Sequence, residues 1–344
     1  MMRWYEQADA ERPAVIGSRV RLVRNWDEYV FPTRLTPEDG AAMLGRLKRA
    51  LRELGEVDGR DYEYLELETL GDLERKALGE RRVINSAIAS KKTPTGLLVS
   101  ENEDTSIVLN GTDHIRIQML DTGLRLRELW NRADRVDDFI GGKISYAFDE
   151  KYGYLTTFPT NMGTGLRASV LLHLPSLSMG RKFNGMVTEM SRFGATVKGV
   201  YGEGSENYGA LYTVSNQKTL GISEREILDL VTKVALQLSN QEEKVRHMAL
   251  EKHRLEWEDE AYKSYGVLKY ARRLSRKDAM TFLSQLMLGL REGLMQTRQP
   301  CSVYSLMLGI QPANLQKNSD RPLDKEELDM ARAAYLRAEL PELK

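Results

Sequence analysis

The stretch Tyr146–Pro175 reads YAFDEKYGYLTTFPTNMGTGLRASVLLHLP, and its polar centre guides the interpretation of the whole chain. The run Tyr154–Phe158 alternates in polarity and predicts a strand that ends before Pro159. A polar loop, Thr160–Gly165, follows, and an apolar segment resumes at Leu166. Because glycine has no Cβ, a loop of this composition can present backbone N–H groups closely to a ligand.

Arg167 lies two residues after the second loop glycine. Its guanidinium is a fixed fork of donors that suits phosphate oxygens. Two interpretations fit these residues: an ordinary strand-loop-strand corner, and an anion-binding loop with Arg167 as its charged ligand. The stretch taken alone leaves both open.

A second candidate for anion binding lies near the start of the chain, in Val15–Asn25 (VIGSRVRLVRN). In an extended segment Arg19 and Arg21 point to one side, and Val20 and Leu22 point to the other. Two guanidinium groups beside an apolar face make a phosphate clamp. A solvated strand face explains the same spacing.

A third polar face follows a predicted hairpin, whose strands are 97–100 and 106–109. The next residues are Asn110–Gln118 (NGTDHIRIQ). Here His114, Arg116 and Gln118 alternate with isoleucines, so we expect the three polar side chains to share one face.

These segments together resemble the ATP:guanido phosphotransferases, the family of creatine and arginine kinases, and most closely its bacterial protein-arginine kinase branch. The central stretch is similar to the family signature, and SRVRLVRN followed by Phe31-Pro32 is similar to its first nucleotide-arginine motif. NGTDHIR is similar to the Asn-Glu-Glu-Asp-His-x-Arg motif of the family.

The resemblance implies an α+β fold, with an antiparallel sheet flanked by helices over residues 1–250. An all-α domain over 251–344 is expected to follow and to serve dimerisation and regulation. SYGVL at 264–268 and QPANLQK at 311–317 resemble that extra domain, which creatine kinase-like members lack. The branch carries a phosphoarginine pocket with an Arg-Asp-x-x-Arg-Ala pattern, and LDMARA at 328–333 is the nearest match.

The resemblance also implies the ligands and the site residues. ATP and Mg²⁺ are the expected cofactors, and no metal ligand is assigned to the protein itself. Glu203 and Arg167 are the predicted catalytic residues, with Glu203 placed against the acceptor guanidinium. The predicted nucleotide-binding side chains are Arg19, Arg21, His114, Arg116, Arg167 and Lys198.

The chain departs from the family pattern mainly on the acceptor side. Gly111 and Thr112 replace two glutamates, Phe158 replaces a cysteine, and Lys198 replaces an arginine. Since a guanidinium must lose a proton as it attacks, a missing carboxylate removes a candidate base.

Two functions therefore remain open. One is a protein-arginine kinase that transfers the ATP γ-phosphoryl group to arginine side chains of proteins. The other is a catalytically impaired pseudokinase that binds ATP and acts as a dimeric regulatory adaptor in protein quality control. The expected partners are arginine-bearing proteins, an activator protein, a Clp-type unfoldase and a second copy of the chain.

Composition agrees with these expectations. Lys+Arg and Asp+Glu number 50 each in 344 residues, so no net charge favours nucleic acid or an anionic membrane. The single cysteine, Cys301, excludes an intrachain disulfide and fits a reducing compartment. The first residues lack the apolar core of a signal peptide, and no apolar run approaches the roughly 20 residues of a membrane span. We expect a cytoplasmic protein.

Helix signals frame these motifs. Thr36 followed by Pro37 predicts a helix start, with buried positions at Met43, Leu44, Leu47 and Leu51. Further helices are predicted over 70–78, 123–139 and 187–193, the last ending at Gly194. Ser223 and Glu226 form a predicted capping box at the start of a long helix that reaches about Glu251.

Overall fold

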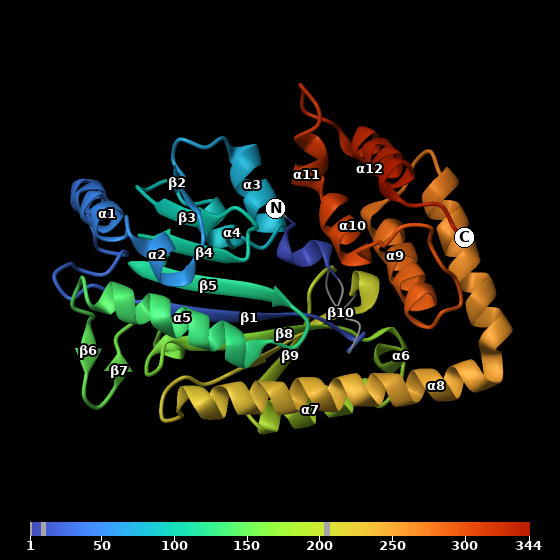
Figure 1. Cartoon of the computed structure of the whole chain (residues 1–344), viewed down its shortest axis with the longest axis horizontal. Helices are drawn as coiled ribbons and strands as arrows, with labels where there is room; N and C mark the ends of the chain where they lie inside the picture. The colour runs from blue at the N-terminus through green and yellow to red at the C-terminus, as the bar shows by residue number, and fades with distance from the viewer. Residues whose placement is uncertain (1, 8–11, 203–206) are drawn as a thin grey trace. The chain divides into compact units, whose positions relative to one another are not determined.

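The computed structural model describes residues 2–7, 12–202 and 207–344. Its main feature is an eight-stranded sheet with the strand order β2-β3-β4-β5-β1-β8-β10-β9 (Figure 1). A separate two-stranded hairpin is formed by β6 and β7. The strands are β1 Val15–Arg24, β2 Tyr62–Glu66, β3 Gly96–Ser100, β4 Thr105–Leu109, β5 Ile115–Thr122, β6 Phe148–Asp149, β7 Gly153–Tyr154, β8 Leu166–His173, β9 Ala195–Gly199 and β10 Leu211–Asn216.

Helices flank the sheet and make up the C-terminal part of the chain. The α-helices are α1 Pro37–Ala50, α2 Leu54–Asp58, α3 Asp72–Glu80, α4 Ser86–Ala89, α5 Leu126–Gly141, α6 Pro175–Ser178, α7 Phe183–Arg192, α8 Glu224–Tyr270, α9 Arg276–Arg291, α10 Val303–Gly309, α11 Pro312–Gln316 and α12 Lys325–Glu339. Short 3₁₀ turns are η1 Trp4–Glu6, η2 Pro159–Asn161 and η3 Tyr208–Ala210. None of the helices in the described residues has the length and apolar character of a membrane span.

The described chain divides into two compact units. The first contains Met1–Trp4, Gly17–Val170 and Ser215–Lys233. The second contains Tyr5–Ile16, Leu171–Val214 and Val234–Lys344.

The first unit is built on antiparallel pairing of β1 with β5, β5 with β4, β4 with β3 and β3 with β2. One face of this sheet carries a cluster of buried aliphatic side chains from α3, α4, β3, β4 and the segments that connect such elements: Leu67, Leu78, Val83, Ile84, Ile88, Leu97, Val99 and Val108. Burial of such side chains is the main favourable term in folding, at about 25 cal/mol per Å² of apolar surface. In β1 the alternation is as predicted, since Val20 and Leu22 are fully buried while Arg19 and Arg21 are half-buried.

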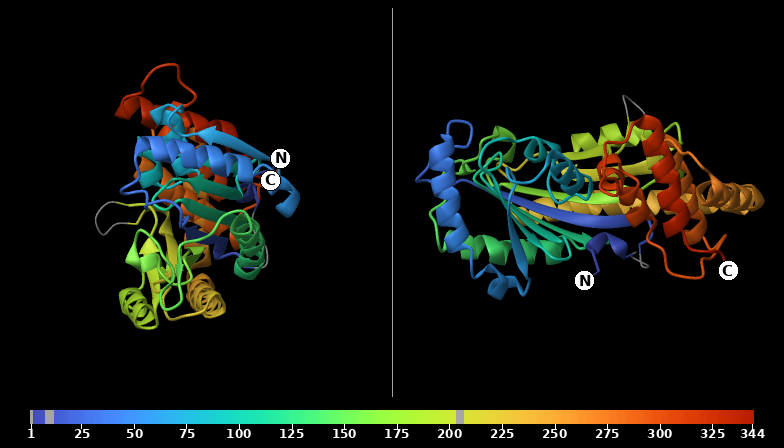
Figure 2. Two further views of the ribbon diagram at one scale, coloured as in Figure 1. Left: turned by 90° about the vertical axis from the view of Figure 1, so that its left-hand side faces the viewer. Right: turned by 90° about the horizontal axis from the view of Figure 1, so that it is seen from above.

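The second unit includes the helices α9 to α12, drawn in orange to red in Figure 2. Ser275 caps α9 by accepting from the backbone N–H of Asp278, and Asp324 forms a capping box with Glu327 at the start of α12. His173 at the end of β8 lies 2.7 Å from the Ser284 hydroxyl of α9 through its Nε2. These capped helices pack around buried leucine and methionine side chains such as Leu283, Met307 and Leu336.

Most of the predicted elements are confirmed. Thr36 accepts from the backbone N–H of Asp39 and caps α1, and Ser223 and Glu226 bond reciprocally at the start of α8. The predicted hairpin is β3–β4, and Gly194 follows α7 with φ of 90°. The helix α8 extends past Glu251 to Tyr270, with a single non-helical residue at His253.

The prediction of a strand over 154–158 is wrong. Only Tyr154, with Gly153, pairs as a strand. The backbone N–H of Leu155 donates to Ala147, and that of Thr157 donates to the Asp113 carboxylate. Since these donors are used outside a ladder, the segment runs irregularly into η2.

Candidate functional site

Arginine side chains from three neighbouring strands share one face of the sheet in the first unit. In the β1–β5 register Arg21 lies opposite Gln118, and Val23 lies opposite Arg116. Residues two apart and residues directly opposite point to the same face, so Arg19, Arg21 and Arg116 lie together. The neighbouring strand β8 contributes Arg167. Ser169 of β8 accepts a hydrogen bond from Arg19 Nε at 3.1 Å, and Arg167, two residues before Ser169, points to the same face.

Neutral groups hold these arginines in place. Arg21 Nη2 donates to Asn161 Oδ1 at 3.2 Å, which joins β1 to the loop before β8. Arg116 Nη2 donates to Gln118 Oε1 at 3.0 Å, and Arg167 Nη1 donates to the Asn216 carbonyl at 3.1 Å. Neutral acceptors orient the guanidinium groups without cancelling their charge.

The charges of the arginine face repel one another. Burial, together with the charges of Arg116, Arg19 and Arg167, holds the pKa of Arg21 well below its ordinary value. Burial also lowers the pKa of Arg116 to about 10. Among the described residues, Arg21 Nε and two nitrogens of Arg116 are buried without a hydrogen-bond partner. Buried donors without partners are costly, so the arrangement is suited to a bound anion with several oxygens.

Asp113 is the carboxylate that acts on this cluster. It is fully buried, and its charge raises the pKa of both Arg21 and Arg116 against the effect of burial. Its Oδ1 accepts from Asn25 Nδ2 at 2.9 Å and from the Thr157 N–H at 2.7 Å. Its Oδ2 is buried without a hydrogen-bond partner among the described residues. Asp113 therefore fixes the segment before η2 and faces the arginines electrostatically.

The loop between η2 and β8 has a backbone path that requires glycine. Gly163 and Gly165 have φ of 98° and 66°. A Cβ at Gly163 would lie 2.3 Å from the Thr219 carbonyl oxygen, and one at Gly165 would lie 2.6 Å from the Val23 carbonyl oxygen. The sharp turn brings Arg167 onto the arginine face.

Arg24 supports this loop from the opposite side of β1. Its side chain is buried and ion-paired with Asp137 at 2.6 Å, and it stacks 3.6 Å from the Tyr154 ring centroid. Its Nη1 donates to the Thr164 carbonyl at 3.0 Å. Arg24 thus ties the strand of Arg19 and Arg21 to the loop.

His114 is neutral and bonded to backbone through both ring nitrogens. The Trp26 N–H donates to Nδ1 at 3.0 Å, so Nε2 carries the proton and donates to the Val30 carbonyl at 3.0 Å. Burial lowers the pKa of His114. In this structure the ring holds segment 26–30, and its predicted contact with a nucleotide stays a prediction.

The positions that depart from the family pattern have different surroundings. Gly111 is closed in, since a Cβ there would lie 2.9 Å from Ile88 Cδ1 and 3.1 Å from Val108 Cγ1. Thr112 is half-buried, and Phe158 is 50% exposed. Lys91 anchors this turn by donating to the Gly111 carbonyl at 2.8 Å.

The remaining predicted residues lie elsewhere. Lys198 belongs to the second unit, where it is exposed on β9. Glu203 lies outside the described residues. Arg332, from the predicted phosphoarginine pattern, is buried and bonds Asp329, the Leu274 carbonyl and the Ile310 carbonyl. In the described ranges no group of three or more His, Cys, Asp or Glu side chains is placed to hold a metal ion.

Sequence reasoning missed several residues that position the arginines. Asn161, which bonds Arg21, belongs to the polar loop that the sequence marks as a candidate site. Ser169, which bonds Arg19, is two residues from Arg167, and this spacing indicates that the two side chains share one face of a strand. Arg24 carried the weakest signal, because its odd spacing from Arg21 turns it away from the arginine face and into the core.

The chain belongs to the ATP:guanido phosphotransferase family. The family model described as "ATP:guanido phosphotransferase, C-terminal catalytic domain" matches residues 43–245. A second model, "Protein-arginine kinase McsB C-terminal domain", matches residues 254–344.

Relatives and solved structures agree with that membership. The chain is 40% identical over 344 residues to a protein-arginine kinase of Desulforamulus reducens, covering 99% of this chain and 96% of the relative. It is 36% identical over 340 residues to a protein-arginine kinase of Halothermothrix orenii, covering 99% and 97%. The crystal structure of a lombricine kinase shares the fold, with a TM-score of 0.59 at 23% identity over 72% of this chain and 70% of that chain.

Proposed function

We propose that this protein transfers the γ-phosphoryl group of ATP to arginine side chains of proteins. The observation that carries the proposal is the arginine face of Arg19, Arg21, Arg116 and Arg167, in which buried N–H groups of Arg21 and Arg116 have no partner among the described residues. Family membership and the relatives named protein-arginine kinase supply the reaction class and the acceptor.

In this proposal the arginine face binds the triphosphate. Arg19, Arg21 and Arg116 contact the phosphate oxygens, with His114 and Lys198 as further nucleotide ligands by resemblance. The arginine face fits a polyanion because Arg21 and Arg116 have buried donors without a partner among the described residues, and because the charge of the polyanion would relieve the repulsion between the guanidinium groups. Mg²⁺ would neutralise the phosphates and be held largely through phosphate oxygens and water.

Arg167 has the catalytic role of stabilising charge on the transferring group. The acceptor guanidinium nitrogen forms the new N–P bond as the bond from the γ-phosphorus to the β–γ bridging oxygen breaks, and ADP leaves. The attacking nitrogen gives its proton to a carboxylate, for which Glu203 is the proposed base. The charge of Asp113 favours the protonated form of Arg21 and Arg116.

A second candidate function is the ATP-binding adaptor with impaired catalysis. It is favoured by the surroundings of Gly111, where an added Cβ would lie 2.9 Å from Ile88 Cδ1, so that Ile88 would have to shift to admit a carboxylate-bearing side chain. Thr112 has no basic group, and loss of a positioned base costs about 10²–10⁴ in rate.

We expect a phosphotransfer assay to separate the two functions. The assay combines labelled ATP, magnesium and an arginine-rich acceptor protein with the unmodified chain and with Thr112→Glu. Thr112 is chosen because it is half-buried, whereas position 111 is closed in. Acid-labile label on arginine from the unmodified chain supports the kinase.

Transfer only by Thr112→Glu would show that the missing carboxylate limits the reaction. ATP binding without transfer in either protein would favour the adaptor. Arg167→Ala serves as the variant in which both binding and transfer are expected to fall, and unchanged nucleotide affinity there would remove Arg167 from the site.

We further propose that residues 1–250 form the catalytic part and that 251–344 form a dimerisation and regulatory part. The ranges of the two matching family models support this division. A second copy of the chain, an activator protein and a Clp-type unfoldase are the proposed partners, acting in the cytoplasm. Light scattering on the full chain tests the dimer, since a monomeric mass at micromolar concentration would contradict it.

A further inference from the structure

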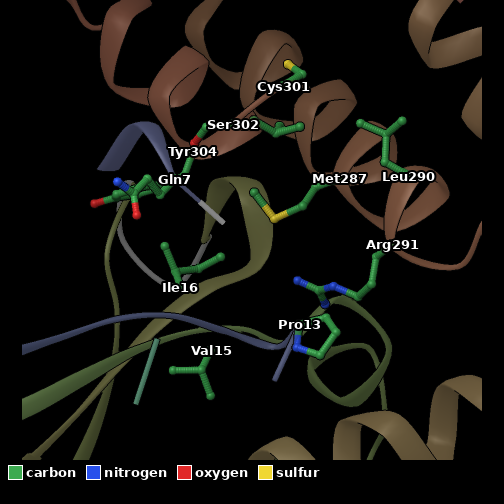
Figure 3. Close-up of a pocket in the computed structure, with 11 residues that line it drawn as sticks. Gln7, Pro13, Val15, Ile16, Met287, Leu290, Arg291, Cys301, Ser302 and Tyr304 are labelled. Atoms are coloured by element: carbon green, nitrogen blue, oxygen red, sulfur yellow. The ribbon is translucent and has the colours of Figure 1, made fainter. Parts of the chain in front are cut away.

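The second unit contains a cavity of about 370 Å³. The walls come from the N-terminal segment and from α9 and α10, and they are mainly apolar (Figure 3). Its lining includes Pro13, Val15, Ile16, Met287, Leu290 and Val303. A cavity of this size with mostly apolar walls and few polar groups is typical of a small-molecule site.

The walls are held by direct contacts. Ser302 donates its hydroxyl hydrogen to the Tyr5 carbonyl at 2.6 Å, which fastens the N-terminal segment to the start of α10. The same hydroxyl oxygen accepts from the Ser305 N–H at 3.2 Å as the helix cap. Tyr5 and Val15 are themselves buried. These contacts fix part of the cavity wall in the ligand-free protein.

Among the described residues that line this cavity, Arg291 is the charged one. It extends from the last turn of α9, and Figure 3 shows its guanidinium reaching toward Pro13. Its Nη1 is buried without a hydrogen-bond partner among the described residues. Burial, and then the charge of Arg246, lower the pKa of Arg291 to about 10.

Two of the three carboxylates whose charges act on Arg291 are bonded to other groups. Glu292 pairs with Arg246 at 2.5 Å. The two oxygens of Glu242 accept from the backbone N–H groups of Ser176 and Leu177 at 3.1 and 2.7 Å. The Arg291 side chain thus lines the cavity, and its buried Nη1 has no hydrogen-bond partner among the described residues.

We propose that this cavity binds a small amphipathic monoanion, a carboxylate on an apolar body. A carboxylate would pair with the single guanidinium, and its apolar body would cover Ile16, Met287 and Leu290. A phosphate monoester fits less well, because its second charge would face apolar walls without a second cation. The proposal does not depend on the phosphotransfer reaction.

Isothermal titration of the full-length protein tests this site with octanoate, octan-1-ol and inorganic phosphate as probes. We expect octanoate to bind at one site per chain. Octan-1-ol should bind about 10- to 100-fold more weakly, because it lacks the charge that pairs with Arg291. Phosphate should not compete with octanoate.

Two variants and one control locate the binding. Arg291→Met should weaken octanoate by a similar factor, and Leu290→Trp should abolish binding of both organic probes by filling the cavity. Arg272→Met, at an exposed position of the same unit, should leave binding unchanged. Circular dichroism of each variant checks that it is folded.

Equal affinities for octanoate and octan-1-ol in the unmodified protein would overturn the proposal without any variant. So would octanoate binding that persists in both Arg291→Met and Leu290→Trp. Competition by phosphate as strong as octanoate would overturn the choice of a monoanion.

Discussion

At the scale of single residues, the arginine face contains buried donors without a hydrogen-bond partner among the described residues. Arg116 is almost fully buried, and its pKa is lowered to about 10, first by burial. Two of its nitrogens have no hydrogen-bond partner among the described residues. Such a residue destabilises the ligand-free protein, and the loss is recovered when an anion binds.

Replacing this arginine should therefore separate binding from stability. In Arg116→Met we expect ADP affinity to fall about 10- to 100-fold, as for loss of a charge-assisted contact. The free energy of unfolding without nucleotide should stay the same or rise by about 1 kcal/mol, because a buried charge is removed. Titration calorimetry and urea denaturation measure the two quantities.

Arg52→Met is the matched control for this prediction, since Arg52 is exposed in the same unit. It should change neither quantity. A loss of both affinity and stability in Arg116→Met would instead mean that the residue is structural.

At the scale of elements, the turn into β8 depends on glycine at defined points. Gly165 combines φ of 66° with a neighbouring Val23 carbonyl oxygen 2.6 Å from an added Cβ. Arg24 closes the same turn, because an added Cβ would also lie 2.5 Å from its Nη1. The backbone of this turn therefore leaves no space for a side chain at position 165.

We predict that Gly165→Ala costs about 2–4 kcal/mol in the free energy of unfolding, through strain at positive φ and close contact. Gly59→Ala is the matched control, because Gly59 has φ of 71° but nothing within 4 Å of an added Cβ. It should cost about 1 kcal/mol. Urea denaturation compares the two, and equal costs would show that φ alone matters.

At the scale of the whole molecule, two buried histidines link stability to pH. Burial lowers the pKa of His114, and it holds the pKa of His173 well below its ordinary value. Both side chains are fully buried. In the unfolded chain each would take up a proton below a pH of about 6.5, so the unfolded state binds more protons there. Their contribution to stability is present above that pH and is lost as the pH falls.

We expect His173→Gln to flatten the pH dependence of stability between about pH 6.5 and 5. The change in slope should reach up to about 1.4 kcal/mol per pH unit, the value for one proton. His247→Gln is the control, since His247 is exposed and should leave the slope unchanged. Urea denaturation across this pH range measures the slopes, and a parallel curve for His173→Gln would refute the linkage.

Much of the architecture could be predicted because its signals are local. The caps at Thr36 and Ser223, the alternation in β1 and the hairpin at 97–109 depend on residues within a few positions of one another. The strand predicted over 154–158 failed for the opposite reason. Its backbone donors are taken by Ala147 and by Asp113, the latter 44 residues away, so no local pattern could show it.

The sequence by itself determined the family, the three arginine-bearing segments and the departures at Gly111, Thr112 and Phe158. Only the tertiary structure decided that four arginines share one face of the sheet: Arg19, Arg21, Arg116 and Arg167. It also decided that His114 is hydrogen-bonded through both ring nitrogens and that Arg291 lines an apolar cavity. The physical reason is the distance along the chain over which each effect acts. Side-chain periodicity acts over a few residues, whereas burial, charge repulsion and unfilled donors depend on strands and helices that are distant in the chain.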